Sequence, residues 1–524
     1  MNKQKVLAAV LAACVAAVPL VGCGKDKKTE GEASNSFTYW ATLPDSAASH
    51  IQSFNEMTYY QELERRTGVH VKFVHPPAGQ AAEQFNLMVA SGSDSLYDMI
   101  EYNWIDYAGG PDKAVSDGII IDMTDMLEEN APNISKLFKE NDTYRRLSYT
   151  DEKRFCLFPM LITSKHKVFG GIMIRKDWLD DLNLKVPETI ADWETTLRAF
   201  KEQKGATAPL TLSKWQMTGN LGQFNNAFNV GLNMYVDNGK IKYPQMEPGY
   251  KEFLTLMNKW YKEGWLDNEY DTNTSSVVDA KMTNGSSGAT YGYVGGTIGR
   301  YMSAVKDKDP NYALAAAPYP VANPGDEPRF MECTFDVKSP YVGISTNCSD
   351  PAGAMKWMDY AYSEEGSILT TFGVEGDTYT KEGDSYVYTD KIMHNPEGLS
   401  IAEAMGVNFR ANEPAPGLQY SGDDYLKQYY TIPAQWDALE TWSKYEDNAP
   451  KSMMPPLSST LEESEEFISL NSEIKTYVEE MLLKFIKGSE PLENYEAFQE
   501  QLKSMGVERL VELKQLALDR YNNR

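Results

Sequence analysis

The chain has 524 residues, of which 75 are Asp or Glu and 50 are Lys or Arg, so its formal net charge is −25. A surface with this charge repels phosphate backbones and anionic headgroups, which excludes nucleic acid as an expected partner. A chain of this length is too long for a single hydrophobic core, and we therefore expect two lobes.

The amino terminus has the parts of an export signal. Two lysines precede an apolar run over residues 6–20, which is shorter than the roughly 20 apolar residues that a membrane-spanning helix needs. Leu20-Val21-Gly22-Cys23 follows and resembles the bacterial lipobox. The resemblance implies that residues 1–22 are a signal peptide and that diacylglycerol on the Cys23 sulfur anchors the protein. The alternative is an ordinary secretory signal in which Cys23 occurs by chance.

The segment behind Cys23 has the composition of a tether. Residues 24–36 are polar or charged and include no large apolar side chain, so we expect residues 23–36 to be unstructured. Loss of residues 1–22 removes two lysines and no acidic residue, and the mature net charge becomes −27. No later segment is long and apolar enough to span a bilayer. We therefore expect the protein on the extracellular face of the cell membrane, held there only by lipid.

Three cysteines remain once Cys14 has left with the signal and Cys23 carries lipid. They are Cys156, Cys333 and Cys348, an odd number with no CxxC spacing. A bridge between Cys333 and Cys348 is compatible with the sequence, but buried free thiols are the expectation.

The first part of the mature chain alternates between strand and helix patterns. A capping box at Ser53 and Glu56 predicts the start of a helix that ends at Gly68. The other predicted elements here are strands at Phe37–Trp40, 69–73 and Tyr97–Glu101 and a helix over about Gln80–Ala90. This rhythm is typical of a doubly wound α/β sheet, in which ligands bind beyond the carboxyl ends of the strands.

Later segments continue the mixed pattern and then become helical. A strand at Ile172–Arg175 is followed by predicted helices at Lys176–Leu182, Thr189–Lys201 and Tyr250–Glu263, with connecting strands and loops over about 318–340. Three helices are expected at the end of the chain, over about Glu463–Lys487, Leu492–Met505 and Val507–Tyr521.

Several segments together resemble one family. Besides the lipobox and tether they are Tyr60–Val74, Asn86–Gly92, Asp177–Trp193, Asn258–Asp267, Ser363–Tyr379 and Phe485–Tyr521. In their order and spacing they resemble the extracellular solute-binding lipoproteins of ABC importers, in the branch found with oligosaccharide transporters of Gram-positive bacteria. The likeness covers nearly all of the mature chain.

The resemblance implies an α/β fold of the type II periplasmic-binding-protein kind, with two lobes, a hinge and a ligand cleft between them. The N-terminal lobe is expected to hold residues 37–155 and about 336–405, and the C-terminal lobe residues 156–335 and about 406–524. It further implies a monomer that captures a solute, which the resemblance to this branch indicates is an oligosaccharide, and delivers it to permease subunits in the membrane. No catalysis and no cofactor are implied.

Metal sites are not expected. Relatives that bind acidic oligosaccharides carry a calcium loop after the helix equivalent to Thr189–Lys201, but residues 202–208 here offer a single carboxylate. The segment from Asp271 has the start of a calcium-loop pattern but lacks Gly at its sixth position (Ser276) and an acid at its twelfth (Met282). The five histidines show no zinc-binding spacing.

Candidate ligand contacts are aromatic and polar side chains near strand ends or in polar loops, because sugars stack on flat apolar faces and bond to planar polar groups. Each also has an ordinary interpretation as a core aromatic, a flexible turn or an ion pair. The candidates are Trp40, Asp45, Asn103, Trp104, Trp215, Tyr293, Arg300, Glu375 and Asp377.

Two other classes of function were compared with solute binding. Carboxylates are abundant, so a cell-surface glycoside hydrolase or lyase is conceivable, although no nucleophile motif such as Gly-x-Ser-x-Gly is present. A surface adhesin without an enclosed cleft is the other alternative.

Overall fold

The computed structural model describes residues 36–218, 224–410, 415–420 and 422–524. The predicted signal peptide, Cys23 and the tether up to residue 35 lie outside these residues. In the described part, no helix combines the length and apolar character needed to cross a membrane. Cys156, Cys333 and Cys348 are free thiols, which confirms the expectation from their number. Burial raises the pKa of both Cys333 and Cys348 to about 12.

The first lobe is built on a mixed six-stranded sheet with the order β13-β4-β10-β3-β1-β2. β1 is parallel to both β2 and β3, and β10 is antiparallel to β3 and β4, so the strand and helix alternation of the sequence gives the doubly wound arrangement that it predicted. The strands are β1 (Ser36–Trp40), β2 (His70–Val74), β3 (Met99–Tyr102), β4 (Phe158–Ile162), β10 (Val337–Ile344) and β13 (Gly417–Gln419).

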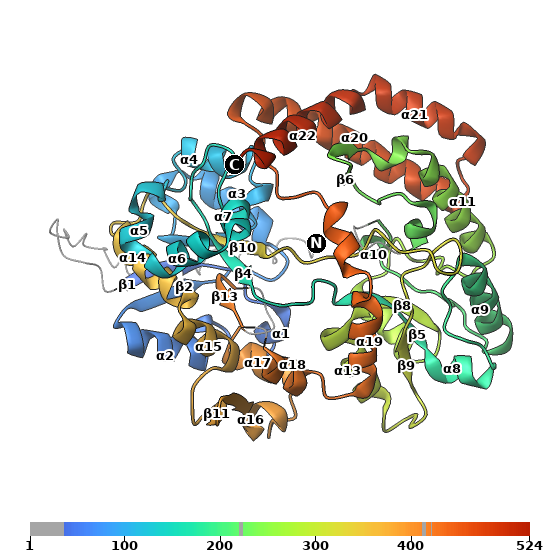
Figure 1. Cartoon of the computed structure of the whole chain (residues 1–524), viewed down its shortest axis with the longest axis horizontal. Coiled ribbons are helices and arrows are strands. Elements are labelled where there is room, and N and C mark those ends of the chain that lie inside the picture. The colour runs from blue at the N-terminus through green and yellow to red at the C-terminus, as the bar shows by residue number, and fades with distance from the viewer. Residues whose placement is uncertain (1–35, 219–223, 411–414, 421) are drawn as a thin grey trace, which may run out of the picture.

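Helices cover this sheet on the left side of Figure 1. One boundary differs from its prediction. Ser53 does form a capping box with Glu56, but the box caps a short 3₁₀ turn at Phe54–Glu56. Met57 has an extended backbone conformation that separates this turn from α2, so α2 runs over Thr58–Thr67. The helices of this lobe are α1 (Asp45–Ala48), α2, α3 (Ala81–Ala90), α4 (Gly110–Ser116), α5 (Leu127–Asn130), α6 (Pro132–Glu140), α7 (Asp142–Ser148), α14 (Pro351–Asp359), α15 (Glu364–Phe372), α16 (Asp390–Met393) and α17 (Ile401–Asn408).

The second lobe is built on a smaller antiparallel sheet with the order β8-β5-β9. Its strands are β5 (Gly170–Arg175), β8 (Ala289–Tyr293) and β9 (Leu314–Ala316), and β6 (Tyr235–Asp237) forms a small hairpin with β7 (Lys240–Lys242). A second hairpin, β11 (Tyr379–Glu382) with β12 (Ser385–Tyr388), lies with the first lobe, where β12 packs on α16. Its helices are α8 (Lys176–Asp181), α9 (Ile190–Gln203), α10 (Lys214–Thr218), α11 (Pro248–Lys262), α12 (Ser275–Thr283), α13 (Gly299–Val305) and α19 (Pro433–Ser443).

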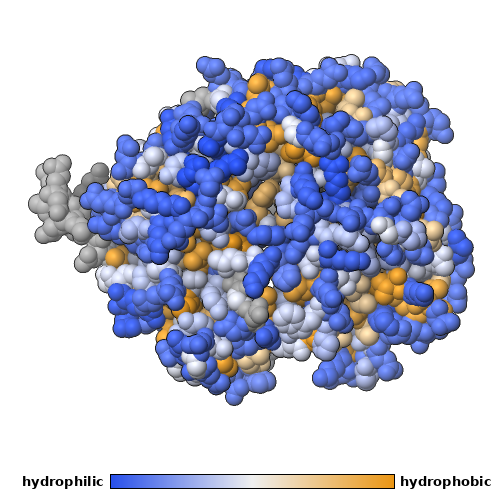
Figure 2. Space-filling view, in the orientation of Figure 1, coloured by the Kyte–Doolittle hydropathy of each residue, from blue (hydrophilic) through white to orange (hydrophobic). Residues whose placement is uncertain are grey.

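Three helices at the end of the chain extend from the second lobe toward the first. They are α20 (Leu461–Lys487), α21 (Tyr495–Ser504) and α22 (Val507–Asn522). α20 packs against α11 of the second lobe and also contacts α4 of the first. Figure 1 shows the three helices along the upper side of the molecule, with the carboxyl terminus beside the first lobe. Hydrophilic residues cover most of the face in Figure 2.

The chain crosses between the lobes more than once, and two crossings lie later than the boundaries predicted near residues 155 and 405. The first is later because β4 still belongs to the first sheet, although residues 156–335 were expected in the C-terminal lobe. The connection from β4 to β5 leads into the second lobe, and the connection from β9 to β10 leads back. β13 pairs with β4 in the first sheet, so the first lobe extends beyond the predicted boundary near residue 405. The crossing falls between α18 (Asp423–Tyr429), which packs on β12, and α19, which packs on β9. The sequence missed it because β13 has only three residues.

A buried ion pair holds this returning segment in the first lobe. The two terminal nitrogens of the Arg410 guanidinium group donate to the Glu101 carboxylate on β3, at 2.9 and 3.0 Å. The side chains of Arg410 and Glu101 are only 3 % and 5 % exposed. The hydroxyl of Tyr39 on β1 donates to the same carboxylate at 2.7 Å. Arg410 also donates to the Tyr60 hydroxyl. The pair therefore links β1, α2 and β3 to the chain that follows α17.

We expect Glu101→Gln to lower the free energy of unfolding by about 3–5 kcal/mol, because the Arg410 guanidinium stays buried without a counter-charge. Denaturant unfolding followed by circular dichroism measures this change. The control is Lys136→Gln, which removes an exposed partner of Glu140 and should leave the unfolding midpoint unchanged. Equal midpoints for the two variants would contradict the role assigned to the pair.

Candidate ligand-binding cavity

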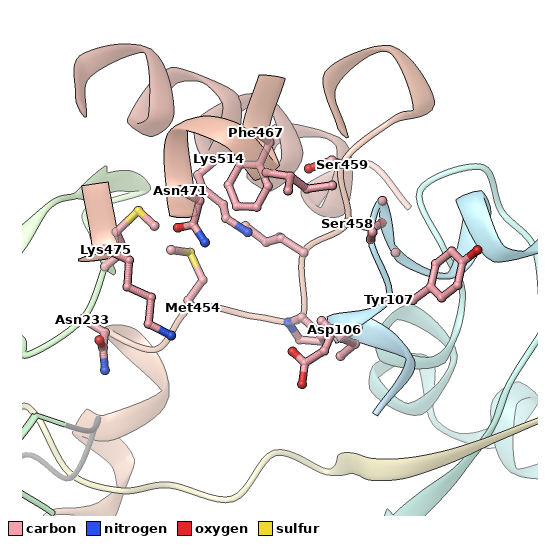
Figure 3. A pocket seen from close by; sticks show the side chains of 18 of the residues that line it. Asp106, Tyr107, Asn233, Met454, Ser458, Ser459, Phe467, Asn471, Lys475 and Lys514 are labelled. Carbon is pink, nitrogen blue, oxygen red and sulfur yellow. The ribbon is translucent and has the colours of Figure 1, made fainter. Parts of the chain in front are cut away.

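A cavity of about 940 Å³ lies between the two lobes and is lined from both. The first lobe contributes the loop after β3, the end of α7 and Tyr341 of β10. The second lobe contributes two loops, at 232–234 and 243–245, and one face of α20. The segment that leads into α20 completes the lining with Met454 and residues 456–459. Figure 3 shows part of this lining from close by.

The wall from the first lobe follows a buried strand. β3 ends at Tyr102, and the chain then turns through a 3₁₀ segment, Trp104–Asp106. Gly109 and Gly110 both have positive φ values, 89° and 73°, which favour glycine and allow α4 to begin immediately. The turn leaves Asp106 exposed, and its carboxylate accepts a hydrogen bond of 2.6 Å from Asn103 Nδ2. Asp106 therefore places a carboxylate with further acceptor capacity at the edge of the cavity.

The opposite wall is one face of α20. Thr460 and Glu463 form a capping box that starts this helix, and Gly488 ends it in the left-handed region. Phe467, Asn471, Lys475 and Glu479 follow one another at intervals of four residues, and all of them line the cavity. This spacing places side chains on one helical face. In Figure 3, Asn471 and Lys475 extend from α20 into the space that Asp106 borders from the other lobe.

Lys514 of α22 adds a half-buried ammonium group to this wall. Its Nζ lies 4.2 Å from the centre of the Phe467 ring, within the range of a cation–π contact. Burial lowers the pKa of Lys514 to about 8, because the charged form loses hydration. Neither a hydrogen bond nor an ion pair joins Lys514 to the described part of the chain.

An ion-pair cluster fastens the end of α22 to the first lobe beside the cavity. The Asp151 side chain is 4 % exposed and accepts hydrogen bonds from Arg520 at 3.2 Å and from Arg524 at 2.5 and 2.8 Å. Arg524 also donates to the backbone carbonyls of Arg146 and Tyr149. Since α22 packs on α20, this cluster holds one cavity wall against the other lobe.

Tyr293, a predicted contact, lies close to the crossing segments instead of the cavity. It ends β8 opposite Gly170, the first residue of β5. Its hydroxyl donates to Glu332 at 2.9 Å, and the Tyr291 hydroxyl donates to the same carboxylate. Burial and the neighbouring Glu332 raise the pKa of Tyr293. The ring is 37 % exposed, so a ligand contact by Tyr293 stays a prediction.

Two predicted tryptophans belong to the core in this structure. Trp104 has no exposed surface, and its indole nitrogen donates to the Ile100 carbonyl at 3.1 Å. Trp40 is 3 % exposed and packs near Phe85 and Tyr102. Both tryptophans do lie at strand ends, as predicted, but their rings are packed in the core. For Trp104, the hydrogen bond to the Ile100 carbonyl holds the indole in this inward position. In this conformation neither ring offers a face to a solute.

The other predicted contacts are scattered. Arg300 forms a two-pronged pair with Asp279 at 2.6 and 3.0 Å, and Asp377 pairs with Lys391 at 2.7 Å. Glu375 is exposed in the loop before β11. Asp45 starts α1 and Trp215 lies in α10, but both side chains are outside the described part. Of the predicted set, only Asn103 touches the cavity's edge, through Asp106.

The two segments that resemble calcium loops, residues 202–208 and the segment from Asp271, form ion pairs and a helix cap in the structure. Lys204 pairs with Asp181 at 2.6 Å, and Asp271 pairs with Lys487 at 2.8 Å. Thr274 caps α12 by accepting a hydrogen bond from the Val277 amide. Among the described residues, no group of three or more His, Cys, Asp or Glu side chains is placed to hold a metal ion.

Sequence reasoning missed the residues that line the α20 wall. Asn471, Lys475 and Glu479 are polar positions at helical spacing, a pattern that is typical of any solvated helix face. Lys514 lies on a different helix, and only the packing of α22 on α20 brings it to Phe467. The one usable signal was the polar loop after β3, which the sequence did select through Asn103.

The comparisons with known proteins agree with this architecture. The sequence profile of the bacterial extracellular solute-binding proteins matches residues 47–368. The chain therefore belongs to the bacterial extracellular solute-binding proteins. Its two-lobed α/β architecture is the type II periplasmic-binding-protein fold that the sequence predicted.

Individual relatives are distant but match over much of their length. The lipoprotein LipO of Bacillus subtilis (strain 168) is 22 % identical over 408 residues, covering 74 % of this chain and 77 % of LipO. The fructooligosaccharide ABC transporter substrate-binding protein FusA of Streptococcus pneumoniae serotype 4 (strain ATCC BAA-334 / TIGR4) is 23 % identical over 497 residues, covering 89 % of this chain and 87 % of FusA. The calcium-free crystal structure of the alginate-binding protein AlgQ2 superimposes with a TM-score of 0.74 at 22 % identity, covering 92 % of this chain and 98 % of AlgQ2.

We expect Asp151→Asn to release the end of α22 from the first lobe, because Arg524 loses its counter-charge and Arg520 keeps only its pair with Glu463 on α20. Amide hydrogen exchange in residues 515–524 should become at least about tenfold faster, equivalent to about 1.4 kcal/mol of local stability. The control is Arg509→Gln on the same helix, which breaks two exposed pairs, with Glu466 and with Glu512, and leaves Asp151 untouched. Unchanged exchange in Asp151→Asn would show that the cluster does not hold α22.

Proposed function

We propose that this protein captures an oligosaccharide in the cavity between its lobes and delivers it unchanged to the permease of an ABC importer. The single observation that carries the proposal is a cavity lined from both lobes in a member of the solute-binding family. Its volume of about 940 Å³ lies at the upper end of the range of small-molecule sites, about 300–1,000 Å³. That size favours an oligomer over a single sugar ring.

The lining suits a polyhydroxylated ligand. Asn233, Gln245 and Asn471 provide amide groups, and Asp106 provides a carboxylate acceptor. Tyr107, Tyr243 and Phe467 add aromatic rings to the lining, and rings of this kind offer apolar faces for sugar stacking. The names of relatives point the same way, since FusA is named for fructooligosaccharides and AlgQ2 for alginate.

Capture requires no chemistry on the ligand. A solute that contacts Asp106 on one lobe and Asn471 on the other favours whichever arrangement of the lobes satisfies both contacts, so it shifts the population toward the closed form. A permease that recognises the closed form would then distinguish loaded from empty protein. The protein acts in this scheme as a monomeric, non-catalytic receptor.

The proposed attachment uses lipid on Cys23. The protein belongs to an extracellular family, and the related LipO is named a lipoprotein. The tether of residues 24–36 would let the lobes reach a permease beside the anchor. One thioether-linked diacylglycerol supplies two acyl chains, which suffice for stable anchoring.

Binding can be tested by a thermal-shift screen of neutral and acidic oligosaccharides. We expect at least one to raise the melting temperature, because a ligand at 100 times its Kd stabilises the folded form by about 2.7 kcal/mol. Asp106→Ala and Asn471→Ala should each weaken that binding, Asp106→Ala by about tenfold or more through loss of a charged acceptor. Glu375→Ala, in an exposed loop that does not line the cavity, is the control.

Mass spectrometry of the recovered ligand completes this test. An unchanged mass after long incubation supports capture without turnover. Shortened or unsaturated products would instead identify a glycoside hydrolase or lyase, and no binding by any saccharide would overturn the proposal.

The anchor is tested by Cys23→Ala in a Gram-positive host. We expect the unaltered protein in the membrane fraction and the variant in the medium, because the variant has no sulfur to carry lipid. Immunoblots of cell and medium fractions measure the distribution. Equal membrane retention of both proteins would refute lipid attachment at Cys23.

A further inference from the structure

The charges that line the cavity do not balance within the protein. The described lining includes five charged side chains: Asp106, Lys475, Glu479, Lys514 and Arg524. Arg524 is neutralised by Asp151, and Glu479 pairs with Lys214 at 3.2 Å. Two ammonium groups and the single carboxylate of Asp106 are left without an ion pair in the part of the chain that the structure describes.

On α20 and α22, the lysine and arginine side chains without an ion pair in the described part of the chain are the two that line the cavity, Lys475 and Lys514. Elsewhere on the same two helices Lys484 pairs with Glu480, Lys487 with Asp271 and Arg509 with Glu466. The lysines that face the cavity are those that lack such partners.

Lys514 has no counter-charge in the part of the chain that the structure describes, and its ammonium group lines the cavity. Phe467 covers the ammonium group on one side at 4.2 Å, and burial lowers its pKa to about 8. Losing hydration without gaining a counter-ion disfavours the charged form. A bound anion would restore the balance and would make a charge-assisted hydrogen bond.

Lys475 and Asn471 extend the same wall. They stand four residues apart on α20, and Asn471 in turn stands four residues after Phe467. The wall from α20 and α22 therefore carries two ammonium groups and an amide. Asp106 faces this space from the other lobe and can accept hydrogen bonds from hydroxyl groups but would repel an anion.

We propose that the solute is an anionic oligosaccharide, whose carboxylate or other acidic group binds Lys475 and Lys514 while its hydroxyl groups face Asp106. This inference rests on the proposed function and specifies its substrate class. The arrangement gives the ligand one orientation, because reversal would place its anion against Asp106. It also makes binding depend on both lobes.

The test uses a set of three oligosaccharides that differ only in the group at C6. They are trigalacturonate, its carboxyl-reduced neutral form, and a sulfate ester of the neutral form, which shows whether the site prefers a carboxylate or accepts another anion. Isothermal titration calorimetry gives the affinity ratio within this set. We expect an acidic member to bind at least about tenfold more tightly than the neutral one, and less tightly as salt is raised.

Two variants connect that ratio to the proposed residues. Lys514→Met keeps the apolar stem over Phe467 and removes the charge, and Lys475→Gln changes an exposed position that folding does not need. Each should lower the ratio by about tenfold or more and leave the affinity for the neutral form unchanged. Lys444→Met is the control, because Lys444 also lies over an aromatic ring, Tyr445, but does not line the cavity.

The outcomes separate the two proposals. A neutral member that binds as well as its acidic counterpart, or a ratio unchanged in both variants, overturns the anionic preference and leaves solute binding intact. If only neutral oligosaccharides bind, the anionic preference is likewise overturned and solute binding stays intact. If no saccharide of any kind binds, the proposed function itself fails.

Discussion

Buried Asp151 of the first lobe pairs with Arg520 of α22 and with Arg524 just beyond that helix, and these ion pairs join the terminal helices to the first lobe. α22 packs on α20, and α20 packs on α11 of the second lobe, so the terminal helices belong to both halves of the molecule. Their position gives the cavity a wall that neither sheet could supply. Ion pairs out of water are costly to break, which makes this link a firm one.

The molecule uses buried charge in two ways. Glu101 and Arg410 neutralise each other inside the first lobe, and Tyr39 donates to the same carboxylate, so the two buried charges are balanced within the protein. Lys514 is the reverse case, a partly dehydrated cation that lies over the Phe467 ring. A satisfied pair stabilises a fold, whereas an unsatisfied charge beside a cavity has free energy to gain from a ligand.

Much of the fold could be predicted from the sequence because local patterns determine it. The alternation of strands and helices before residue 102 gave the parallel core of the first sheet, and Thr189, Gly488 and Gly506 stand at helix ends as capping rules require. Trp104 shows the limit. Its position after β3 was right, but whether an indole faces a ligand or the core depends on packing partners such as Phe85, which lie far away in sequence. The contact between Lys514 and Phe467 likewise depends on the packing of two helices and could not be predicted from local sequence.

The proposed function requires that a solute binds between the lobes, and a crystal structure of the complex tests this requirement most directly. With an oligosaccharide that stabilises the protein, we predict electron density in the space between Asp106 and α20, touching both lobes. Density confined to one lobe, or density at the Tyr293–Glu332 cluster with the cavity filled only by water, would contradict it.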